Sequence, residues 1–389
     1  MIPRAWPRYN PPVSRVIYQE KEYKSVLNRY RFIDSWFWCR YGLNTYSGCE
    51  HACTYCDSRS HKYHLQPDFD HLIYIKKDIA GLLDRRISRA RKLLPDVVAI
   101  SGVSDPYQPA EQEFGNTRAC LEVLLRHGWP VFVSTKSVLV TRDADLFAMI
   151  AEKSSCAVAI TITATDEKLS GFLEPSAPLP RERLDAIREL KKVKGLQVGV
   201  SLIPIVPVIG DSDECLESVV KNARAAGADF ILFGGMTMRD SQALWFLGRL
   251  REEFGESMTR EFLALYDGEI TPEGEFRGRY APKGSYCLRI NRKMLGLCEK
   301  HGLAFRIRRF IPDDFRRENY LIAEELLNEA YLLQSTGKAW SNLFWAGQNI
   351  NNLAEPIRAI AERRELRKIR NVNEDIEARI LKRLGEIIG

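Results

Sequence analysis

Three cysteines stand close together in the stretch SGCEHACTYCDSRS, residues 47–60, and no second cysteine pair follows at short spacing. Their positions are Cys49, Cys53 and Cys56. A structural zinc ion normally takes four protein ligands, arranged as two pairs with a longer insert between them. A cubane 4Fe-4S cluster held by only three thiolates keeps one iron open for a further ligand. The odd number of thiols therefore favours an iron-sulfur site with one free coordination position.

Two other interpretations of the three thiols stay open. They could be separate core or surface residues, although the neighbouring Gly48, His51 and Tyr55 are typical of a polar loop. A zinc ion could also be completed by His51, His61 or His64. We expect the iron-sulfur site, because a zinc knuckle has no need of the strand and helix pattern around the motif.

The composition indicates a soluble globular chain. It has 389 residues, 45% hydrophobic content and a formal net charge of +6, which is enough for one large domain with extensions. No run approaches the roughly 18 apolar residues of a membrane span, and the N-terminal MIPRAWPRYNPPVSR has no apolar signal-peptide core. We therefore expect a cytoplasmic protein without a membrane partner, in which reducing conditions keep the nine cysteines as thiols.

Buried strands alternate with helices through the middle of the chain. The strands are predicted at 97–101, 131–135, 157–163, 198–206 and 229–235, after a first strand LNTYSG at 43–48 and a short extra one at 73–75. Helices are predicted at 117–128, 142–153, 180–195 and 213–227. About six βα units fit between residues 43 and 255, fewer than the eight of a complete barrel. The pattern predicts an α/β fold, a partial (β/α)6 TIM-like barrel with a C-terminal helical extension.

The two ends of the chain differ from the middle. Residues 1–40 are rich in Pro, Arg and Trp, and we expect an N-terminal extension that wraps over the core. Residues 41–312 form the predicted barrel domain. From residue 313 to residue 389, apolar residues recur at spacings of three and four, which predicts a helical C-terminal region.

The cysteines follow the first predicted strand, where the carboxyl ends of parallel strands collect active-site groups. This Cys-x3-Cys-x2-Cys spacing resembles the radical S-adenosylmethionine (SAM) superfamily. GCEHACTYCDSRSHKY, followed by SGVSDPYQPAEQEFGNTRACLEVL and FLEPSAPLPRERLDAIREL, is similar to its spore photoproduct lyase-like family. The resemblance covers about residues 40–310.

That resemblance implies a cofactor pair. Cys49, Cys53 and Cys56 would hold a 4Fe-4S cluster, whose open iron would be chelated by the amino and carboxylate groups of SAM. Reduction by a donor such as flavodoxin or ferredoxin would cleave SAM to a 5'-deoxyadenosyl radical, which abstracts hydrogen from the substrate.

Further residues follow from the resemblance and from their places at strand ends. Tyr55 would lie beside the adenine of SAM. Ser104 and Asp105 would meet its ammonium group, and Lys136 its carboxylate. Thr161 is a weaker candidate because its register within the strand is uncertain. Glu174, in LEPS, matches an acidic position of the family and receives only a loop or substrate-side role.

One position departs from the family. In spore photoproduct lyase a cysteine two residues before the Ser-Asp pair returns a hydrogen atom to the product, and the matching residue here is Gly102. Repair of a thymine dimer by that route is therefore not expected. Cys120 lies in an apolar helical stripe typical of packing. Cys287 and Cys298 are interpreted as ordinary buried thiols rather than a redox pair or ligands. No chemistry is assigned to the remaining cysteines, Cys39, Cys156 and Cys215.

The segment 277–317 carries twelve Lys and Arg residues against three acidic ones, which would attract a polyanion. One hypothesis is a radical SAM enzyme acting on nucleic acid, in DNA repair or base modification, with Tyr280, Phe305 and Phe310 contacting bases. A second is radical chemistry on a protein or small molecule, the segment being a solvated face. A third is a non-catalytic iron-sulfur nucleic-acid-binding protein, against which Ser104, Asp105 and Lys136 argue.

Overall fold

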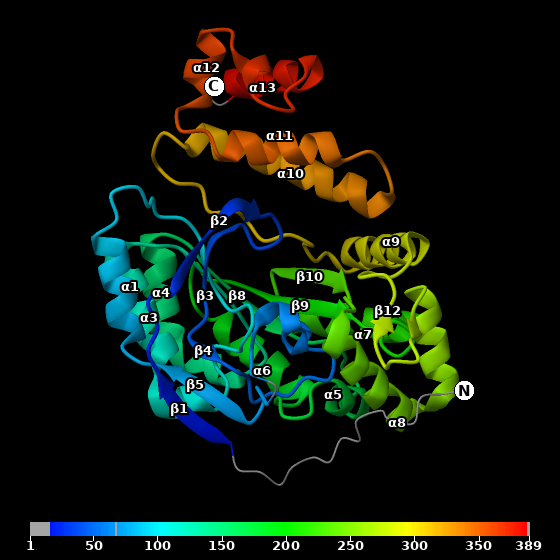
Figure 1. The fold of residues 1–389 in the computed structure, drawn as a ribbon. Coiled ribbons are helices and arrows are strands. Elements are labelled where there is room, and N and C mark those ends of the chain that lie inside the picture. The colour runs from blue at the N-terminus through cyan, green and yellow to red at the C-terminus, as the bar shows by residue number, and fades with distance from the viewer. Residues whose placement is uncertain (1–15, 67, 387–389) are drawn as a thin grey trace. The chain divides into compact units, whose positions relative to one another are not determined.

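The structure is a computed structural model that describes residues 16–66 and 68–386. It contains two compact units (Figure 1). The first combines Met1–Arg29 with Tyr41–Ile307, and the second combines Tyr30–Arg40 with Arg308–Gly389. The three-part division expected from the sequence stays a prediction. Among the described residues, no helix is both long and apolar enough to cross a membrane.

A seven-stranded sheet in the order β10-β9-β8-β7-β6-β3-β2 is the centre of the fold. Its strands are β2 (Leu27–Asp34), β3 (Cys39–Leu43), β6 (Val98–Ile100), β7 (Val131–Thr135), β8 (Cys156–Thr161), β9 (Gln197–Ile205) and β10 (Phe230–Gly235). Each neighbouring pair from β3 to β10 is parallel. The six parallel strands confirm the predicted partial barrel, and all five strands predicted downstream of the cysteines are present.

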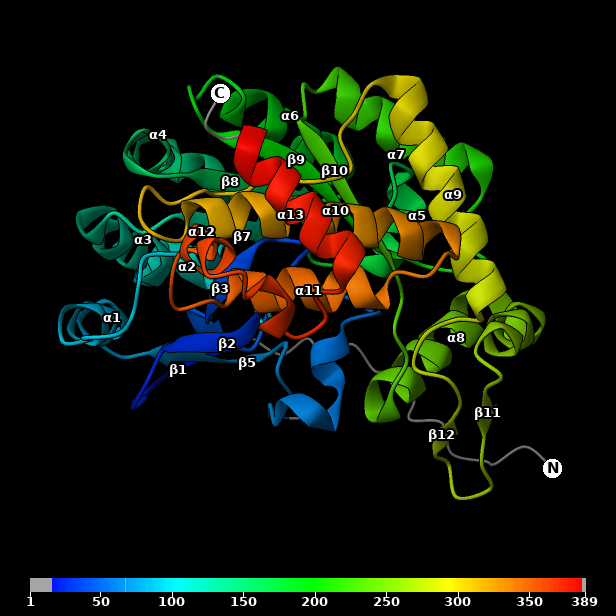
Figure 2. The same cartoon turned by 90° about the horizontal axis from the view of Figure 1, so that it is seen from above.

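Helices cover the sheet because their apolar stripes need burial. They are α1 (Ile79–Ser88), α2 (Ala110–Phe114), α3 (Asn116–His127), α4 (Ala144–Lys153), α5 (Glu167–Leu173), α6 (Pro180–Leu190), α7 (Asp213–Ala225), α8 (Asp240–Leu265) and α9 (Gly284–His301). Figures 1 and 2 show α1, α3 and α4 side by side. Every residue of β8 is buried, as expected of a strand with both faces covered.

The prediction of a first barrel strand at 43–48 was wrong in its position. The barrel strand is β3, and Tyr46–Ser47 forms β4 in a separate sheet of order β1-β5-β4, with β1 at Ile17–Lys21 and β5 at Leu72–Lys76. The carbonyl of Thr45 accepts a hydrogen bond from Asn116 Nδ2 at 3.3 Å instead of one from a neighbouring strand. The chain leaves the barrel sheet at this point, and the next two residues pair with β5. The short extra strand expected at 73–75 is confirmed as β5. A small hairpin pairs β11 (Glu269–Ile270) with β12 (Phe276–Arg277).

The second unit is helical, as expected for the C-terminal region. It contains α10 (Arg317–Thr336), α11 (Ser341–Asn351), α12 (Ile357–Glu362) and α13 (Glu374–Glu386). Residues of β2 pack with these helices: Gln348 Oε1 accepts from the Ile33 amide at 3.2 Å, and Gln348 Nε2 donates to the Ile33 carbonyl at 2.9 Å. Residues 30–40 are therefore part of this unit.

Candidate active site

The cysteine loop, residues 48–60, starts directly after β4. Gly48 opens it at a φ of +96°, and a side chain there would place its Cβ 2.7 Å from the Phe69 carbonyl oxygen and 2.8 Å from that of Leu72. Both the backbone angle and the close approach require glycine. The loop can therefore turn sharply at this point toward the carboxyl ends of the barrel strands.

Gln108, from the SDPYQP segment after β6, clamps the cysteine loop. Its buried amide accepts from the Glu50 amide nitrogen at 3.0 Å and donates to the Gly48 carbonyl at 3.1 Å, on both sides of Cys49. Ser58 adds a hydrogen bond of 3.1 Å to the Val103 carbonyl. The two motifs are thus joined by hydrogen bonds, which explains in physical terms why they occur together.

Of the three cysteines, Cys53 is buried, and Cys49 and Cys56 are partly buried. Burial raises the pKa of all three, that of Cys53 to about 12, and the nearby Asp105, Cys53 and Cys56 raise the pKa of Cys49 further. Thiols in this setting lose their protons readily only when a metal cation replaces them. The donor set therefore fits a bound iron centre better than a set of free thiolates.

A second group of candidate metal ligands lies near the cysteine loop. Among the described residues, Asp68, Asp70 and His71 bring three candidate ligand atoms within 4.8 Å of one another, but Arg59 already neutralises Asp70 at 2.7 Å. The three cysteines are therefore the better candidate ligands, and an iron-sulfur cluster would take one thiolate on each of three irons.

Asp105 follows β6 and joins two strand ends. Its carboxylate accepts from the Thr135 hydroxyl at 2.6 Å, the Lys136 amide at 2.7 Å and the Tyr107 amide at 2.9 Å. Burial alone would raise the pKa of Asp105, but His51 and the Thr135 hydroxyl lower it to about 2. The result is a fixed anion at the carboxyl ends of β6 and β7.

Glu174 and Arg183 form a buried ion pair behind the cysteine loop. The guanidinium donates to Glu174 Oε2 at 2.5 Å and to the Thr161 carbonyl at 2.8 Å. The other carboxylate oxygen, Oε1, accepts from the hydroxyls of Tyr55 and Thr163. Burial would raise the pKa of Glu174, but Arg183 and Lys136 lower it. Glu174 is therefore a buried anion.

Lys136 completes this charge pattern. Its ammonium lies 5.6 Å from the centre of the Tyr55 ring. Burial disfavours the charge, yet the Cys53 sulfur and the Glu174 carboxylate raise the pKa of Lys136. The Lys136 cation thus lies beside the cysteine loop, near the carboxylates of Glu174 and Asp105.

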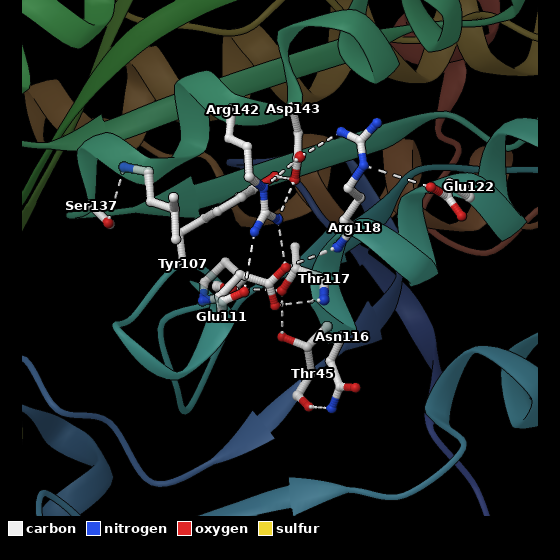
Figure 3. A network of polar contacts seen from close by, with 12 residues as sticks. Thr45, Tyr107, Glu111, Asn116, Thr117, Arg118, Glu122, Ser137, Arg142 and Asp143 are labelled. Carbon is white, nitrogen blue, oxygen red and sulfur yellow. Dashed lines mark hydrogen bonds and ion pairs between the residues drawn. The ribbon is translucent and has the colours of Figure 1, made fainter. Parts of the chain in front are cut away.

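A second buried network supports the segment that carries Asp105 (Figure 3). The fully buried Glu111 accepts from Arg142 at 2.6 Å, from the Thr117 amide at 2.8 Å and from the Tyr46 hydroxyl. Asp143, also fully buried, accepts from Tyr107 and both neighbouring arginines. These bonds hold the segment 101–111 against β4 and the start of α3, so its geometry is set before any ligand binds.

The structure brings most of the predicted site residues to one region, with different immediate partners. Ser104 donates to the Tyr46 carbonyl at 3.0 Å. Tyr55 is only 7% exposed, and its hydroxyl is engaged by Glu174. Thr161 contributes its carbonyl to Arg183, and the hydroxyl two residues later, on Thr163, is the one that meets Glu174.

Sequence reasoning missed the roles of Gln108 and Arg183. The signal for Arg183 was present, because this charged residue lies on the same helical stripe as Leu184, Ile187 and Leu190. A charge on an apolar stripe indicates a buried partner. His51, weighed for zinc, is buried, with Nε2 3.4 Å from Asp105 Oδ2 and Nδ1 3.3 Å from the Ser176 carbonyl.

Gly102 has a structural reason for its identity. Its φ is +137°, and an added Cβ would lie 3.2 Å from Asn44 Oδ1. A cysteine at this position would be strained, which agrees with the departure from the family pattern. Cys120 is fully buried in the core, as expected, and Cys298 is 2% exposed. Cys287 is part-buried, and its thiol lies 3.5 Å from the Pro282 carbonyl.

The cations of the segment 277–317 are largely paired with acids, most of them from other parts of the chain. Lys283 contacts Asp267 at 2.9 Å, and Lys300 contacts Glu217 at 2.6 Å. Further ion pairs of these lysines and arginines are Arg277–Glu269, Arg279–Asp267, Arg289–Asp211, Lys293–Asp213, Arg316–Asp314 and Arg317–Asp313. Counting charges along the sequence therefore overstates the positive field of this segment.

Comparison with known proteins gives one family match and several relatives. A family model described as the Radical SAM superfamily matches residues 43–223. Uncharacterized protein Rv2578c of Mycobacterium tuberculosis (strain ATCC 25618 / H37Rv) is 31% identical over 269 residues, which cover 68% of this chain and 75% of that protein.

Solved structures of spore photoproduct lyase share the fold. A mutant of that enzyme has a TM-score of 0.54 at 13% identity, covering 77% of this chain and 84% of the other. The same enzyme complexed with a dinucleoside spore photoproduct has a TM-score of 0.52 at 13% identity, covering 67% and 74%. At this identity the likeness concerns the fold alone.

Proposed function

The chain belongs to the radical SAM superfamily, and we propose that its substrate is a nucleotide within nucleic acid, modified or repaired by hydrogen abstraction. As a radical SAM enzyme it uses a 4Fe-4S cluster and SAM and needs a reductant. The chemistry that these groups supply when bound is reductive cleavage of SAM to methionine and a 5'-deoxyadenosyl radical, which abstracts a hydrogen atom.

The chain's own residues would hold and orient these groups. Cys49, Cys53 and Cys56 would each bind one iron of the cluster. Lys136 would meet the SAM carboxylate, and Asp105 its ammonium, through the lone-pair sites that its three hydrogen bonds leave free. Ser104, Thr161 and Tyr55 would line the same space, with Tyr55 fixed in orientation by Glu174.

One observation carries this assignment, namely the clamp of Gln108 on the cysteine loop. It ties the loop that bears the thiols to the segment that bears Ser104 and Asp105, whose carboxylate in turn binds the Lys136 amide. A cluster that served only as a structural element would not need this cation and carboxylate beside it. The arrangement therefore supports catalysis over a purely structural iron-sulfur site.

The nucleic-acid substrate has weaker support than the radical chemistry. One structural relative, spore photoproduct lyase, was solved with a dinucleoside spore photoproduct. The segment 277–317 has an excess of cations along the sequence, which favours a polyanionic partner. The reaction of that relative does not transfer directly, since Gly102 lacks the thiol that would return a hydrogen atom.

A protein or small-molecule substrate is the second candidate. The observation in its favour is the pairing of cations in the segment 277–317, because paired groups have less charge to offer phosphates.

Deuterium transfer separates the two candidates. The reconstituted enzyme would be incubated with SAM and dithionite in three reactions, containing perdeuterated nucleic acid, perdeuterated protein or a perdeuterated small-molecule extract. We expect deuterium in 5'-deoxyadenosine only from nucleic acid, and none with the Cys49→Ala, Cys53→Ala, Cys56→Ala triple variant. Label arising only from protein or from the extract would refute the nucleic-acid substrate.

A further inference from the structure

One face of α11, in the second unit, carries three polar or aromatic side chains, and the residue after the helix continues the line. Asn342, Trp345 and Asn349 lie on α11 at spacings of three and four residues, so they share a helix face, and Asn352 directly follows the last helical residue. We call these four residues the α11 stripe. Trp345, near its middle, is 40% exposed, which is unusual for the largest side chain in proteins.

The first flank of the α11 stripe is formed by β2. Asn352 Nδ2 donates to the carbonyl of Arg31 at 3.1 Å. The adjacent Phe32 packs edge-on against Trp345, with ring centres 5.3 Å apart, and the Arg31 guanidinium lies 5.3 Å from the Phe32 ring centre. Arg31 is exposed, and its guanidinium is next to the ring that packs on the indole.

The second flank is formed by the turn before α13. Asn349 Nδ2 donates to the Arg370 carbonyl at 2.9 Å, and Asn342 and Asn371 exchange hydrogen bonds of 3.2 and 3.1 Å. The backbone of Arg370 is held against the helix while its side chain is exposed. Within residues 16–66 and 68–386, no acidic group forms an ion pair with Arg31 or Arg370.

The indole of Trp345 is held in a fixed orientation. The rings of Phe344 and Phe32 lie nearly perpendicular to the indole, at interplanar angles of 82° and 74° and centroid distances of 5.2 and 5.3 Å. An aromatic ring that is fixed before binding loses little conformational entropy when a flat partner stacks on it. Arg31 and Arg370 are exposed and their backbones are hydrogen-bonded to the two flanks of the α11 stripe, so their side chains can reach the phosphates next to a base stacked on this ring.

We propose that the α11 stripe, with Arg31 and Arg370, is a docking surface for single-stranded nucleic acid. A base stacks on Trp345, and flanking phosphates pair with the two arginines. A duplex keeps its base faces stacked and offers none to a lone indole, so the surface selects unpaired strands. The inference rests on the proposed function only in supposing a nucleic-acid partner, and it assigns binding to residues outside the segment 277–317.

Binding of a fluorescein-labelled 20-nucleotide oligothymidylate to the full-length reconstituted chain, followed by fluorescence anisotropy, tests this surface. Trp345→Ala should raise the Kd by about tenfold or more, since stacking on one base is worth roughly 1–3 kcal/mol. Trp345→Phe should keep most of the affinity. The matched control is Leu332→Ala, an exposed apolar residue on α10 that is 40% exposed and should leave the Kd unchanged.

The charge contribution has its own readout. Arg31→Glu and Arg370→Glu should each lower the slope of log Kd against log salt by about 1 or more. The control is Lys382→Glu, at an 80% exposed position on α13, which should leave the slope of log Kd against log salt unchanged. The docking surface would be overturned if the wild type and Trp345→Ala bound the oligothymidylate with the same Kd. It would also be overturned if the wild type bound a polyglutamate peptide as tightly as the oligothymidylate. If deuterium is transferred from nucleic acid but the Kd does not depend on Trp345, this surface is refuted and the proposed function stands. If the Kd depends on Trp345 but no deuterium is transferred from nucleic acid, the surface stands and the proposed function is refuted.

Discussion

At the scale of single residues, the cysteine loop depends on a side chain with no chemistry of its own. Gln108 is fully buried and satisfies one donor and one acceptor of the loop backbone. Replacing it by an apolar residue would leave both backbone groups buried without partners, and each such group costs about 1–3 kcal/mol. Gln108 is therefore a positioning residue for the thiols.

Gln108→Leu should weaken the hold on iron without touching a ligand. We expect iron to dissociate into a chelator about tenfold faster than from the wild type, the equivalent of about 1.4 kcal/mol. Iron release, followed by the absorbance of the chelator complex, measures this. Gln112→Leu is the control, since it makes the same change at an exposed position four residues away. Equal rates of iron release from the two variants would show that Gln108 does not position the thiols.

Lys76 is a buried lysine whose charge the fold opposes. It is 9% exposed, its ammonium lies 4.7 Å from the centre of the Tyr23 ring, and burial lowers its pKa from 10.5 to about 8. Below about pH 8 the Lys76 ammonium is protonated in both the folded and the unfolded chain, and the burial of its charge lowers the free energy of unfolding by its full amount. Above about pH 10.5 the group is neutral in both states, and the cost disappears.

Lys76→Met should therefore stabilise the protein at pH 7 by about 1–2 kcal/mol, allowing for the contact with Tyr23 and for partial exposure. The gain should shrink as pH rises from about 8 to 10.5. Urea unfolding at pH 7, 8.5 and 10 would show this trend. Lys77→Met provides the comparison, because Lys77 is the exposed neighbour. A gain that stayed constant over this pH range would contradict the burial argument.

At the scale of elements, the barrel could be predicted because its strands are continuous apolar runs and its helices have clear apolar stripes. The thiols could be placed at a strand end for the same reason. The position of β4 could not be predicted, because the hydrogen bonds at Thr45 and at Tyr46–Ser47 are made with Asn116 and β5, which lie far along the chain. The ion pair of Glu174 with Arg183 of α6 was not predicted for a similar reason, since neither residue alone indicates its partner.

That ion pair supports a stability prediction. Arg183→Leu leaves the Glu174 carboxylate buried without its cation and should lower the free energy of unfolding by about 3–5 kcal/mol. Adding Glu174→Gln should recover part of the loss, because the amide oxygen still accepts from Tyr55 and carries no charge. Urea denaturation of the two variants measures both effects.

Arg181→Leu on the same helix is the control for this pair. Arg181 is 69% exposed in its ion pair with Glu167, and an exposed pair contributes about 0–1 kcal/mol. If Arg183→Leu cost no more than Arg181→Leu, Glu174 would not be held as a buried anion.

At the scale of the whole molecule, the chain forms two compact units whose sequence segments interleave. Residues 30–40 join the C-terminal helices through contacts between positions some 315 residues apart, such as Ile33 with Gln348. No local pattern predicts a contact of that range. The same holds for the segment 277–317, whose charge was visible in the sequence and whose acidic partners were not.

The central claim is that the chain cleaves SAM reductively at a cluster held by three cysteines, and the release of 5'-deoxyadenosine tests it most directly. The anaerobically reconstituted chain would be mixed with SAM and dithionite, and the products separated by liquid chromatography. We predict 5'-deoxyadenosine from the wild type, none without dithionite, and none from the Cys49→Ala, Cys53→Ala, Cys56→Ala variant. A wild type that carries iron and yields no 5'-deoxyadenosine, or a triple variant that still yields it, would contradict the account.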